Sequence, residues 1–334
     1  MTSLEIYNKI YHTLHPKTYS KQTRHMLALN LIAEVLTLPP HKVLFTDRAK
    51  SFSLTQRLRI DRYLHALNRG VPVGYVLGTT EFCKLKFLTP RGVFLPRVET
   101  EELASHLIAT LPSLLKKLEK ASRTSTHHPS LLDIGTGTGV LAITLKKHFP
   151  TLNVTAIDTS TLALRTAQTN AKRLLPNTAN NRIEFYHCDI FREFRAFAPL
   201  AKQTQASNKT HAPFKERIKT LLNKLFFINS NPVLDRYDII VSNPPYIGEN
   251  DPDLAPTVQH YEPAAALYSG ADGLNFLRAL AEHLPQILSR QGYFYLECGH
   301  NQTQPLSELF QSYQNLTFHK DMFSKHRFIS GQCP

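Results

Sequence analysis

The sequence lacks a long apolar run and a secretion signal, and each absence excludes a class of protein. No stretch of about 18 uninterrupted apolar residues occurs among the 334 residues, which argues against a membrane-spanning helix. The first ten residues, MTSLEIYNKI, contain neither a basic stretch nor an apolar stretch of the kind that directs secretion. Glu5 also precedes the first arginine, Arg24, which disfavours an organellar transit peptide. We therefore expect a cytoplasmic protein.

Paired cysteines and metal-binding histidine motifs are absent as well. The sixteen histidines form no HExxH motif or other cluster with metal-ligand spacing. The four cysteines are scattered without a CxxC pair: Cys83, Cys188, Cys298 and Cys333. This usage is typical of reduced thiols in a reducing compartment. We predict that the chain binds no metal.

The net charge of +13 is concentrated in two segments. Residues 1–82 contain 11 basic residues (Lys or Arg) and 5 acidic residues (Asp or Glu). Residues 192–224 contain 8 basic and 2 acidic residues, so each segment has a net charge of +6. The remainder is nearly neutral at +1. The two basic segments either steer an acidic protein or an RNA-rich assembly toward the chain, or are simply solvated charged faces.

The hydrophobic pattern divides the chain into three parts. Residues 3–69 have helical periodicity, so we predict a helical N-terminal domain over 1–74, followed by a hairpin and connector over 75–100. Residues 101–334 alternate short apolar strands with amphipathic helices, with a polar surface insertion at 192–234. The strands are expected at 130–134, 153–157, 182–187, 237–242, 291–297, 315–320 and 326–331, and the helices at 101–118, 139–148, 160–174 and 273–290. This alternation predicts an α/β fold with a mostly parallel, doubly wound sheet, closed by an antiparallel pair.

A glycine loop follows the first strand of this sheet. It comprises Gly135, Thr136, Gly137, Thr138 and Gly139 and leads directly into a helix. Glycines at such a turn let a ligand approach the main chain closely. Val140 stands where a dinucleotide-binding fingerprint has Gly or Ala, which disfavours a nicotinamide cofactor. Asp158 ends the next strand, where a carboxylate can accept hydrogen bonds from both ribose hydroxyls of an adenosine.

This pattern resembles the class I S-adenosylmethionine-dependent methyltransferases, whose cofactor has a ribose but no pyrophosphate. The resemblance implies a Rossmann-like, seven-stranded sheet that binds S-adenosylmethionine. It also places Asp189, at the end of the third strand, and Ile190 beside the adenine of the cofactor.

A second motif, Asn243-Pro244-Pro245-Tyr246, follows the fourth strand. An amide nitrogen is a poor nucleophile because its lone pair is delocalised, and two acceptors on its N–H bonds return electron density to it. The Asn243 side-chain oxygen and the Pro244 carbonyl can be these acceptors, and Tyr246 can stack on the planar group and exclude water. We therefore interpret Asn243, Pro244 and Tyr246 as catalytic, and Asn243 to Tyr246 as the site that grips a planar amide or amino nitrogen.

Taken with other segments, these motifs resemble the HemK-type protein-(glutamine-N5) methyltransferases over nearly the whole chain. The further segments are Leu95 to Glu101, Tyr261 to Pro263, Gly270 to Leu274, Leu296 to Gly299, and Arg327. The resemblance implies that Gly135 to Gly139, Asp158 and Asn243 bind S-adenosylmethionine. It implies as substrate the GGQ glutamine of class 1 peptide chain release factors. Val98 replaces a usual proline, and the 192–234 insertion exceeds the family's usual short connection.

Three other functions share part of this pattern. A sister branch methylates a glutamine of a ribosomal protein, although Glu99 and Glu101 favour the release-factor branch. Adenine-N6 methyltransferases use the same motif on a flipped base and need a target-recognition region. This chain has a predicted helical N-terminal domain instead, and its basic charge lies away from the catalytic core, so nucleic acid is not expected as a direct substrate. A catalytically inactive ribosome-binding module would tolerate loss of Asn243 or of the glycine loop, and both are intact.

Overall fold

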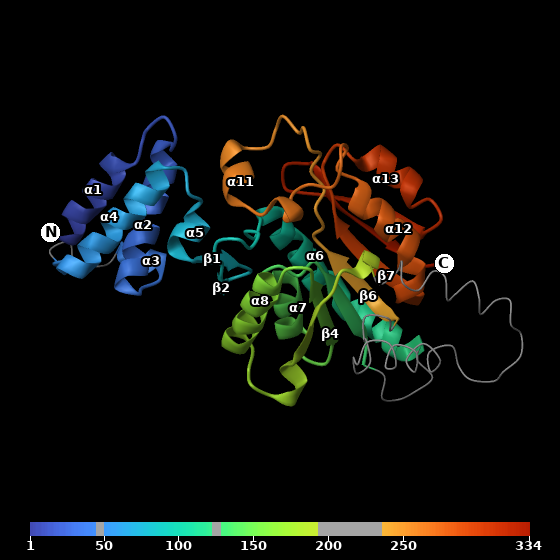
Figure 1. Cartoon of the computed structure of the whole chain (residues 1–334). Helices are drawn as coiled ribbons and strands as arrows, with labels where there is room; N and C mark the ends of the chain where they lie inside the picture. The colour runs from blue at the N-terminus through green and yellow to red at the C-terminus, as the bar shows by residue number, and fades with distance from the viewer. Residues whose placement is uncertain (45–49, 122–127, 193–235) are drawn as a thin grey trace, which may run out of the picture. The chain divides into compact units, whose positions relative to one another are not determined.

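The structure, a computed structural model, describes residues 1–44, 50–121, 128–192 and 236–334. These residues form two compact units. Figure 1 labels most of their helices and strands. Unit 1 comprises the described residues within Met1–Glu81, Leu88–Leu95 and Asp253–Pro263, and unit 2 comprises those within Phe82–Phe87, Pro96–Pro252 and Ala264–Pro334. Of the predicted insertion, all but Arg192 lies outside the described residues, so that prediction stays open.

Unit 1 is mainly helical, as the periodicity of residues 3–69 predicts. Thr2 and Ser53 each begin a helix with a capping box, in which the cap side chain and a Glu5 or Gln56 side chain bond reciprocally to backbone N–H groups. Buried side chains such as Ile10, Leu31 and Ile60 form a shared core. The helices are α1 (Ser3–Thr13), α2 (Lys21–Leu36), α3 (Pro40–Val43), α4 (Leu54–Asn68), α5 (Val73–Leu77) and α11 (Pro256–Tyr261).

Within residues 75–100, where a hairpin and connector are predicted, two short strands pair with each other, but the beginning of the segment is not extended. The short helix α5 occupies residues 73–77 and ends at Gly78, whose φ of 70° is left-handed. The strands β1 (Thr79–Phe82) and β2 (Leu85–Leu88) follow, and Cys83 and Lys84 between them have φ values of 47° and 61°. Two consecutive left-handed residues are typical of the tight turns that join antiparallel strands.

Unit 2 contains a seven-stranded sheet with the order β5-β4-β3-β6-β7-β9-β8. The first five strands in this order are parallel, and β9 pairs antiparallel with both β7 and β8. The predicted fold, a mostly parallel sheet closed by an antiparallel element, is therefore confirmed. The strands are β3 (Ser130–Ile134), β4 (Asn153–Asp158), β5 (Ile183–His187), β6 (Tyr237–Ser242), β7 (Leu288–Glu297), β8 (Gln314–Lys320) and β9 (His326–Gln332).

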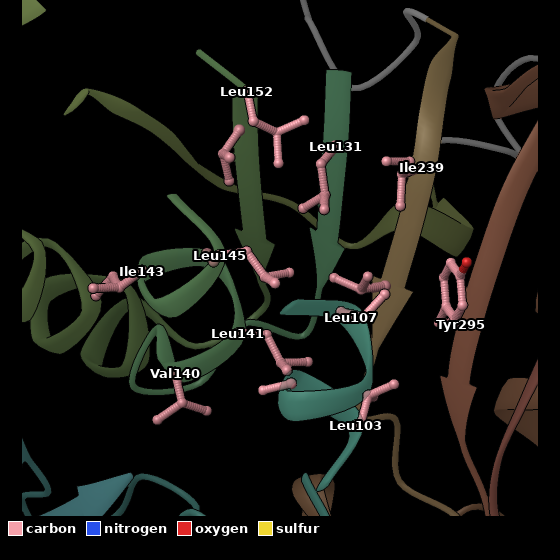
Figure 2. Close-up of a cluster of buried hydrophobic side chains, with 14 of the residues drawn as sticks. Leu103, Leu107, Leu131, Val140, Leu141, Ile143, Leu145, Leu152, Ile239 and Tyr295 are labelled. Carbon is pink, nitrogen blue, oxygen red and sulfur yellow. The ribbon is translucent and has the colours of Figure 1, made fainter. Parts of the chain in front are cut away.

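Helices cover both faces of the sheet because neighbouring strand residues point to opposite sides. Leu131 and Ile239 pack with α6 and α7, whereas Leu132 and Ile240 pack with α12. Figure 2 shows side chains of α6 and α7 gathered over β3 and β6. The helices are α6 (Val98–Ala121), α7 (Val140–His148), α8 (Thr161–Leu174), α12 (Asn275–Ile287) and α13 (Thr303–Leu309), with short 3-10 turns at Ala179–Asn181 and Ala264–Ala266.

The boundaries of α6 and α12 differ from the prediction, and α6 ends at Ala121 rather than at 118. Helix α6 begins at Val98 rather than at 101, so Glu99 and Glu101 lie in its first turn, where acidic side chains complement the helix dipole. Helix α12 ends at Ile287 rather than at 290, because β7 begins directly at Leu288. Among the described residues, no helix combines the length and apolar character that crossing a membrane requires.

Candidate active site

The glycine loop and the NPPY segment meet because they follow neighbouring strands. In the parallel pairing of β3 with β6, Ile134 lies opposite Ser242. The Ser242 hydroxyl also donates a hydrogen bond of 2.7 Å to the Ile134 carbonyl. Gly135 and Asn243 therefore leave the sheet side by side, at the carboxyl edge where open α/β sheets bind their ligands.

The three glycines of the loop have different physical roles. Their φ values are 70°, 57° and 85° at Gly135, Gly137 and Gly139, a region that disfavours side chains. A Cβ on Gly139 would lie 2.7 Å from Ile143 Cδ1 and 3.1 Å from Ala167 Cβ, so close helix packing requires glycine there. A Cβ on Gly135 or Gly137 would meet no atom within 4 Å. The open space beside these two glycines lets a ligand reach the main chain.

Buried polar side chains hold the loop in this shape. Asp133 Oδ2 accepts hydrogen bonds from Thr136 Oγ1 at 2.7 Å and from the Ala142 N–H at 3.2 Å. Burial raises the pKa of the Asp133 carboxyl to about 7. Asn170 of α8 donates to the Thr138 carbonyl at 3.0 Å. Since Thr136 and Thr138 are buried, the loop presents backbone rather than these side chains to its open side.

Asp158 at the end of β4 is fastened to the glycine loop. Its Oδ2 accepts a hydrogen bond from the Gly137 N–H, and its Oδ1 accepts one from the Ser160 N–H, both at 2.8 Å. Burial raises the pKa of this carboxyl, against the lowering effect of these bonds. A backbone hydrogen bond from Thr159 lowers the pKa as well. Because the two carboxylate oxygens together have four acceptor positions, the group keeps capacity for a ligand hydroxyl.

The two residues predicted to flank an adenine, Asp189 and Ile190, differ in their exposure to solvent. Asp189 is exposed, and its Oδ1 accepts hydrogen bonds from the Phe191 and Arg192 N–H groups at 3.1 and 3.2 Å. Ile190 is 3% exposed and belongs to the same buried cluster as Leu274 and Leu277. Their assignment to the adenine therefore stays a prediction.

The NPPY segment, Asn243 to Tyr246, contains two acceptors that no other residue in the described part of the chain engages. Asn243 Nδ2 donates to Thr100 Oγ1 at 2.8 Å, which turns the other end of the amide, Oδ1, away from Thr100. Neither Oδ1 nor the Pro244 carbonyl accepts a hydrogen bond from any residue in the described part of the chain. These are the two acceptors that the sequence predicts.

Tyr246 is held at both its side chain and its backbone. Its hydroxyl donates to Glu297 Oε1 at 3.0 Å, and burial, with the nearby Glu297 charge, raises the Tyr246 pKa well above its usual value. Its carbonyl accepts a hydrogen bond from Gln302 Nε2 at 3.0 Å. A Cβ on Gly273 would lie 2.2 Å from this carbonyl oxygen, so only glycine fits there.

Sequence reasoning placed Thr100 and Glu297 in family-like segments but gave them no role in supporting the NPPY segment. Glu297 is fully buried, Thr100 is 1% exposed, and the Thr100 hydroxyl donates to Glu297 Oε2 at 2.7 Å. Burial raises the pKa of Glu297 to about 7. One signal was available, because Glu297 is an acid that ends an apolar strand, as Asp158 does. Nothing in the sequence pattern indicates that Thr100 lies beside Asn243, 143 residues away.

A family model and several known proteins resemble this chain. Residues 86–198 match the methyltransferase small domain. A release factor glutamine methyltransferase of Streptococcus pneumoniae is 31% identical over 262 residues, which cover 77% of this chain and 74% of that protein. One from Bacillus subtilis is 30% identical, covering 75% and 70%. One from Koribacter versatilis is 28% identical, covering 87% and 85%.

Proposed function

The chain belongs to the family of release factor glutamine methyltransferases, and we propose that it methylates the side-chain nitrogen of the GGQ glutamine in a class 1 peptide chain release factor. S-adenosylmethionine is the methyl donor. The observation that carries this proposal is the pair of unengaged acceptors at Asn243 Oδ1 and the Pro244 carbonyl. A primary amide has two N–H bonds in one plane, and two fixed acceptors match them.

The residues of the glycine loop and its neighbours suit this cofactor. We propose that Gly135 to Gly139 bind it along their backbone and that Asp158 binds its ribose hydroxyls, because the space beside Gly135 and Gly137 is open and Asp158 retains acceptor capacity. We retain Asp189, Ile190 and Asn243 as further cofactor contacts. The bound cofactor supplies an electrophilic methyl group on a positively charged sulfur.

The contribution of the NPPY segment is to position and polarise the glutamine nitrogen. Hydrogen bonds to Asn243 Oδ1 and to the Pro244 carbonyl hold the amide plane and increase electron density on nitrogen. The rigid Pro244-Pro245 unit limits the freedom of the carbonyl, and the Tyr246 ring excludes water beside the planar group. Holding the reacting groups in line supplies most of the rate enhancement. No strong base is needed, because the nitrogen becomes very acidic once it is methylated and then readily loses its proton.

The choice of a release factor as partner rests on the family and on charge. We propose that the helical residues 1–74 recognise the protein substrate, with the net charge of +6 over residues 1–82 steering the encounter. An encounter of this kind slows as salt increases, because salt screens charges that lie more than about 8 Å apart at physiological ionic strength.

The test is methyl transfer from labelled S-adenosylmethionine to a purified class 1 release factor. We expect label in the intact factor, none in a variant with the GGQ glutamine replaced by alanine, and none in duplex DNA. Mass spectrometry of the GGQ peptide should place one methyl group on the glutamine. Label that persists in the GGA variant, or label in DNA, would show that this proposal is wrong.

A further inference from the structure

Glu297 accepts hydrogen bonds from Tyr246 of the NPPY segment and from Thr100, which contacts Asn243 of the same segment. Glu297 is the last residue of β7 and is fully buried. Its carboxyl group accepts one hydrogen bond from the Thr100 hydroxyl at 2.7 Å and one from the Tyr246 hydroxyl at 3.0 Å. Thr100 in turn receives the Asn243 side-chain amide at 2.8 Å. A continuous hydrogen-bonded path therefore runs from Glu297 through Thr100 to Asn243, and we call these three residues the relay.

The number of protons fixes the direction of the relay. An ionised carboxylate can only accept, so both hydroxyls must donate to it. A hydroxyl has a single proton, and once Thr100 has given it to Glu297 only its oxygen lone pairs remain for Asn243. Asn243 must then present its NH₂ group to Thr100, which leaves Oδ1 facing away.

We propose that Glu297 is a positioning residue for methyl transfer, whose ionised carboxylate acts through Thr100 to decide which end of the Asn243 amide faces the substrate. This inference rests on the proposed function, because it concerns the acceptor for the substrate amide. If the Asn243 amide were reversed, its NH₂ group would face the N–H bonds of the glutamine, and donor would oppose donor. The site would then lose one of its two acceptors.

Two charged groups besides the relay act on Glu297 from neighbouring elements. Glu99 of α6 and Arg327 of β9 form an ion pair at 3.4 Å, and Arg327 also binds Asp321 at 2.8 Å. Burial is the largest cause that raises the pKa of Glu297 to about 7, and Glu99 adds to it. The hydrogen bonds from Thr100 and Tyr246, and the charge of Arg327, lower that pKa.

Protonation of Glu297 removes the constraint on the relay. A protonated carboxyl can donate to Thr100, whose own proton is then free to point at Asn243. Either orientation of the amide is then satisfied. We therefore expect the turnover rate to rise as the pH increases through about 7, as the carboxylate forms and fixes the productive orientation.

The first experiment compares Thr100→Val with Thr100→Ser, a matched pair that differs in the hydroxyl. Thr100→Ser keeps the relay and should retain kcat within about threefold. Thr100→Val interrupts it and should lower kcat about 10- to 100-fold, by analogy with the loss of residues that orient metal ligands. The KM for S-adenosylmethionine should be unchanged. Equal kcat values for the two variants would overturn the proposal.

The second experiment uses Glu297→Gln and the pH profile of kcat between about 6 and 9. Glutamine has nearly the same shape as glutamate, but its NH₂ group donates hydrogen bonds, so the relay loses its fixed direction. We expect a lower kcat, and we expect its pH profile to show no transition near pH 7. Tyr246→Phe is the matched control, because it keeps the Thr100 branch but removes a bond that favours the carboxylate. Its transition should move to higher pH. An unchanged transition in Glu297→Gln would contradict the proposal.

The third experiment tests the relay in the free protein and so separates it from the proposed function. The side-chain amide signals of Asn243, assigned by their loss in Asn243→Asp, are followed by NMR from about pH 5 to 9. We expect a transition near pH 7 in the wild type and in Thr100→Ser, and none in Thr100→Val or Glu297→Gln. If release factors are not methylated but this transition is found, the relay stands and the substrate assignment fails. If methylation is found without the transition, the relay is wrong.

Discussion

The glycine loop and the NPPY segment lie at the same edge of the sheet but are stabilised in different ways. The glycine loop depends on its own left-handed backbone and on Asp133, Asp158 and Asn170, all within about forty residues of it in the sequence. The NPPY segment depends on Thr100 and Glu297, which are 143 residues before it and about fifty after it. The part of the site proposed for the cofactor is therefore local in sequence, whereas the part proposed for the substrate is assembled from distant segments.

The largest expected effect follows from removing the acceptor of the NPPY segment. Asn243→Ala should lower kcat by about 10²- to 10³-fold, as does loss of one polar group that stabilises a transition state, while S-adenosylmethionine affinity is largely kept. Steady-state methylation of a release factor and calorimetry of the cofactor measure the two quantities. A near wild-type rate would show that Asn243 is not the acceptor.

Asn243→Asp is the sharper variant at this position. It retains an acceptor oxygen but has no NH₂ group for Thr100, and it adds a negative charge near the positively charged sulfur of the cofactor. The charge favours the cofactor in its ground state over a transition state in which sulfur loses its charge. We expect cofactor affinity to hold or increase while turnover falls.

The next effect concerns the glycine loop. Asp158→Ala should weaken S-adenosylmethionine binding by roughly 1.5–3 kcal/mol, because hydrogen bonds to a charged acceptor are lost. Asp158→Asn retains the shape and one acceptor oxygen, and it should weaken binding less. Calorimetry on both folded variants measures the difference, and unchanged affinity in Asp158→Ala would remove Asp158 from the cofactor site.

A matched pair of glycine substitutions compares the two regions directly. Gly137 and Gly273 have φ values of 57° and 76°, so alanine carries a similar backbone cost at both. Only at Gly273 would the new Cβ also meet the Tyr246 carbonyl, at 2.2 Å. Gly273→Ala should therefore lower the free energy of unfolding by about 1–3 kcal/mol more than Gly137→Ala.

The two glycine substitutions should also affect different functional measurements. Gly137→Ala fills the open space proposed for the cofactor and should mainly weaken cofactor binding, whereas Gly273→Ala displaces the NPPY segment and should mainly lower kcat. Urea denaturation, calorimetry and methylation assays distinguish these outcomes. Equal unfolding free energies would mean that the Tyr246 backbone yields without cost.

The remaining expected effect is a pH dependence of stability. The pKa of Glu297 is about 7 in the folded protein, above its ordinary value of 4.5, so the folded state binds this proton more tightly. Its contribution therefore makes the free energy of unfolding fall as the pH rises from about 4.5 to about 7, by at most about 1.4 kcal/mol per pH unit. Glu297→Gln should reduce this slope, and the exposed Glu308→Gln should not. Urea denaturation at a series of pH values measures the slopes, and equal slopes for wild type and Glu297→Gln would contradict this prediction.

The sequence predicts those features whose cause is local. The strands and main helices follow from hydrophobic periodicity, and the glycine loop follows from a strand, a turn and a helix in succession. The short helix at 73–77 was missed because five residues are too few for a periodic pattern. The end of α12 was placed three residues late because β7 follows it without a loop.

The support of the NPPY segment could not be predicted because it depends on tertiary packing. Thr100 looks like an ordinary residue in the first turn of a helix, and its role arises only where α6 packs beside β6 and β7. The sequence shows the motif at Gly270 to Leu274 but not the physical reason for it. The folded structure shows that reason, because Gly273 closely approaches the Tyr246 carbonyl. Residue types thus point to the groups proposed to face a ligand, but not to the groups that support them.

The position of β9 in the sheet has a consequence for aggregation. β9 comes last of the described strands along the chain, yet it lies inside the sheet, between β7 and β8. Until β9 is in place, β7 presents a row of unpaired N–H and C=O groups next to apolar residues such as Phe294 and Leu296. Exposed strand edges of this kind pair readily with other chains. A variant shortened before His326 should therefore form insoluble aggregates during expression, rather than a smaller protein with a weakened site.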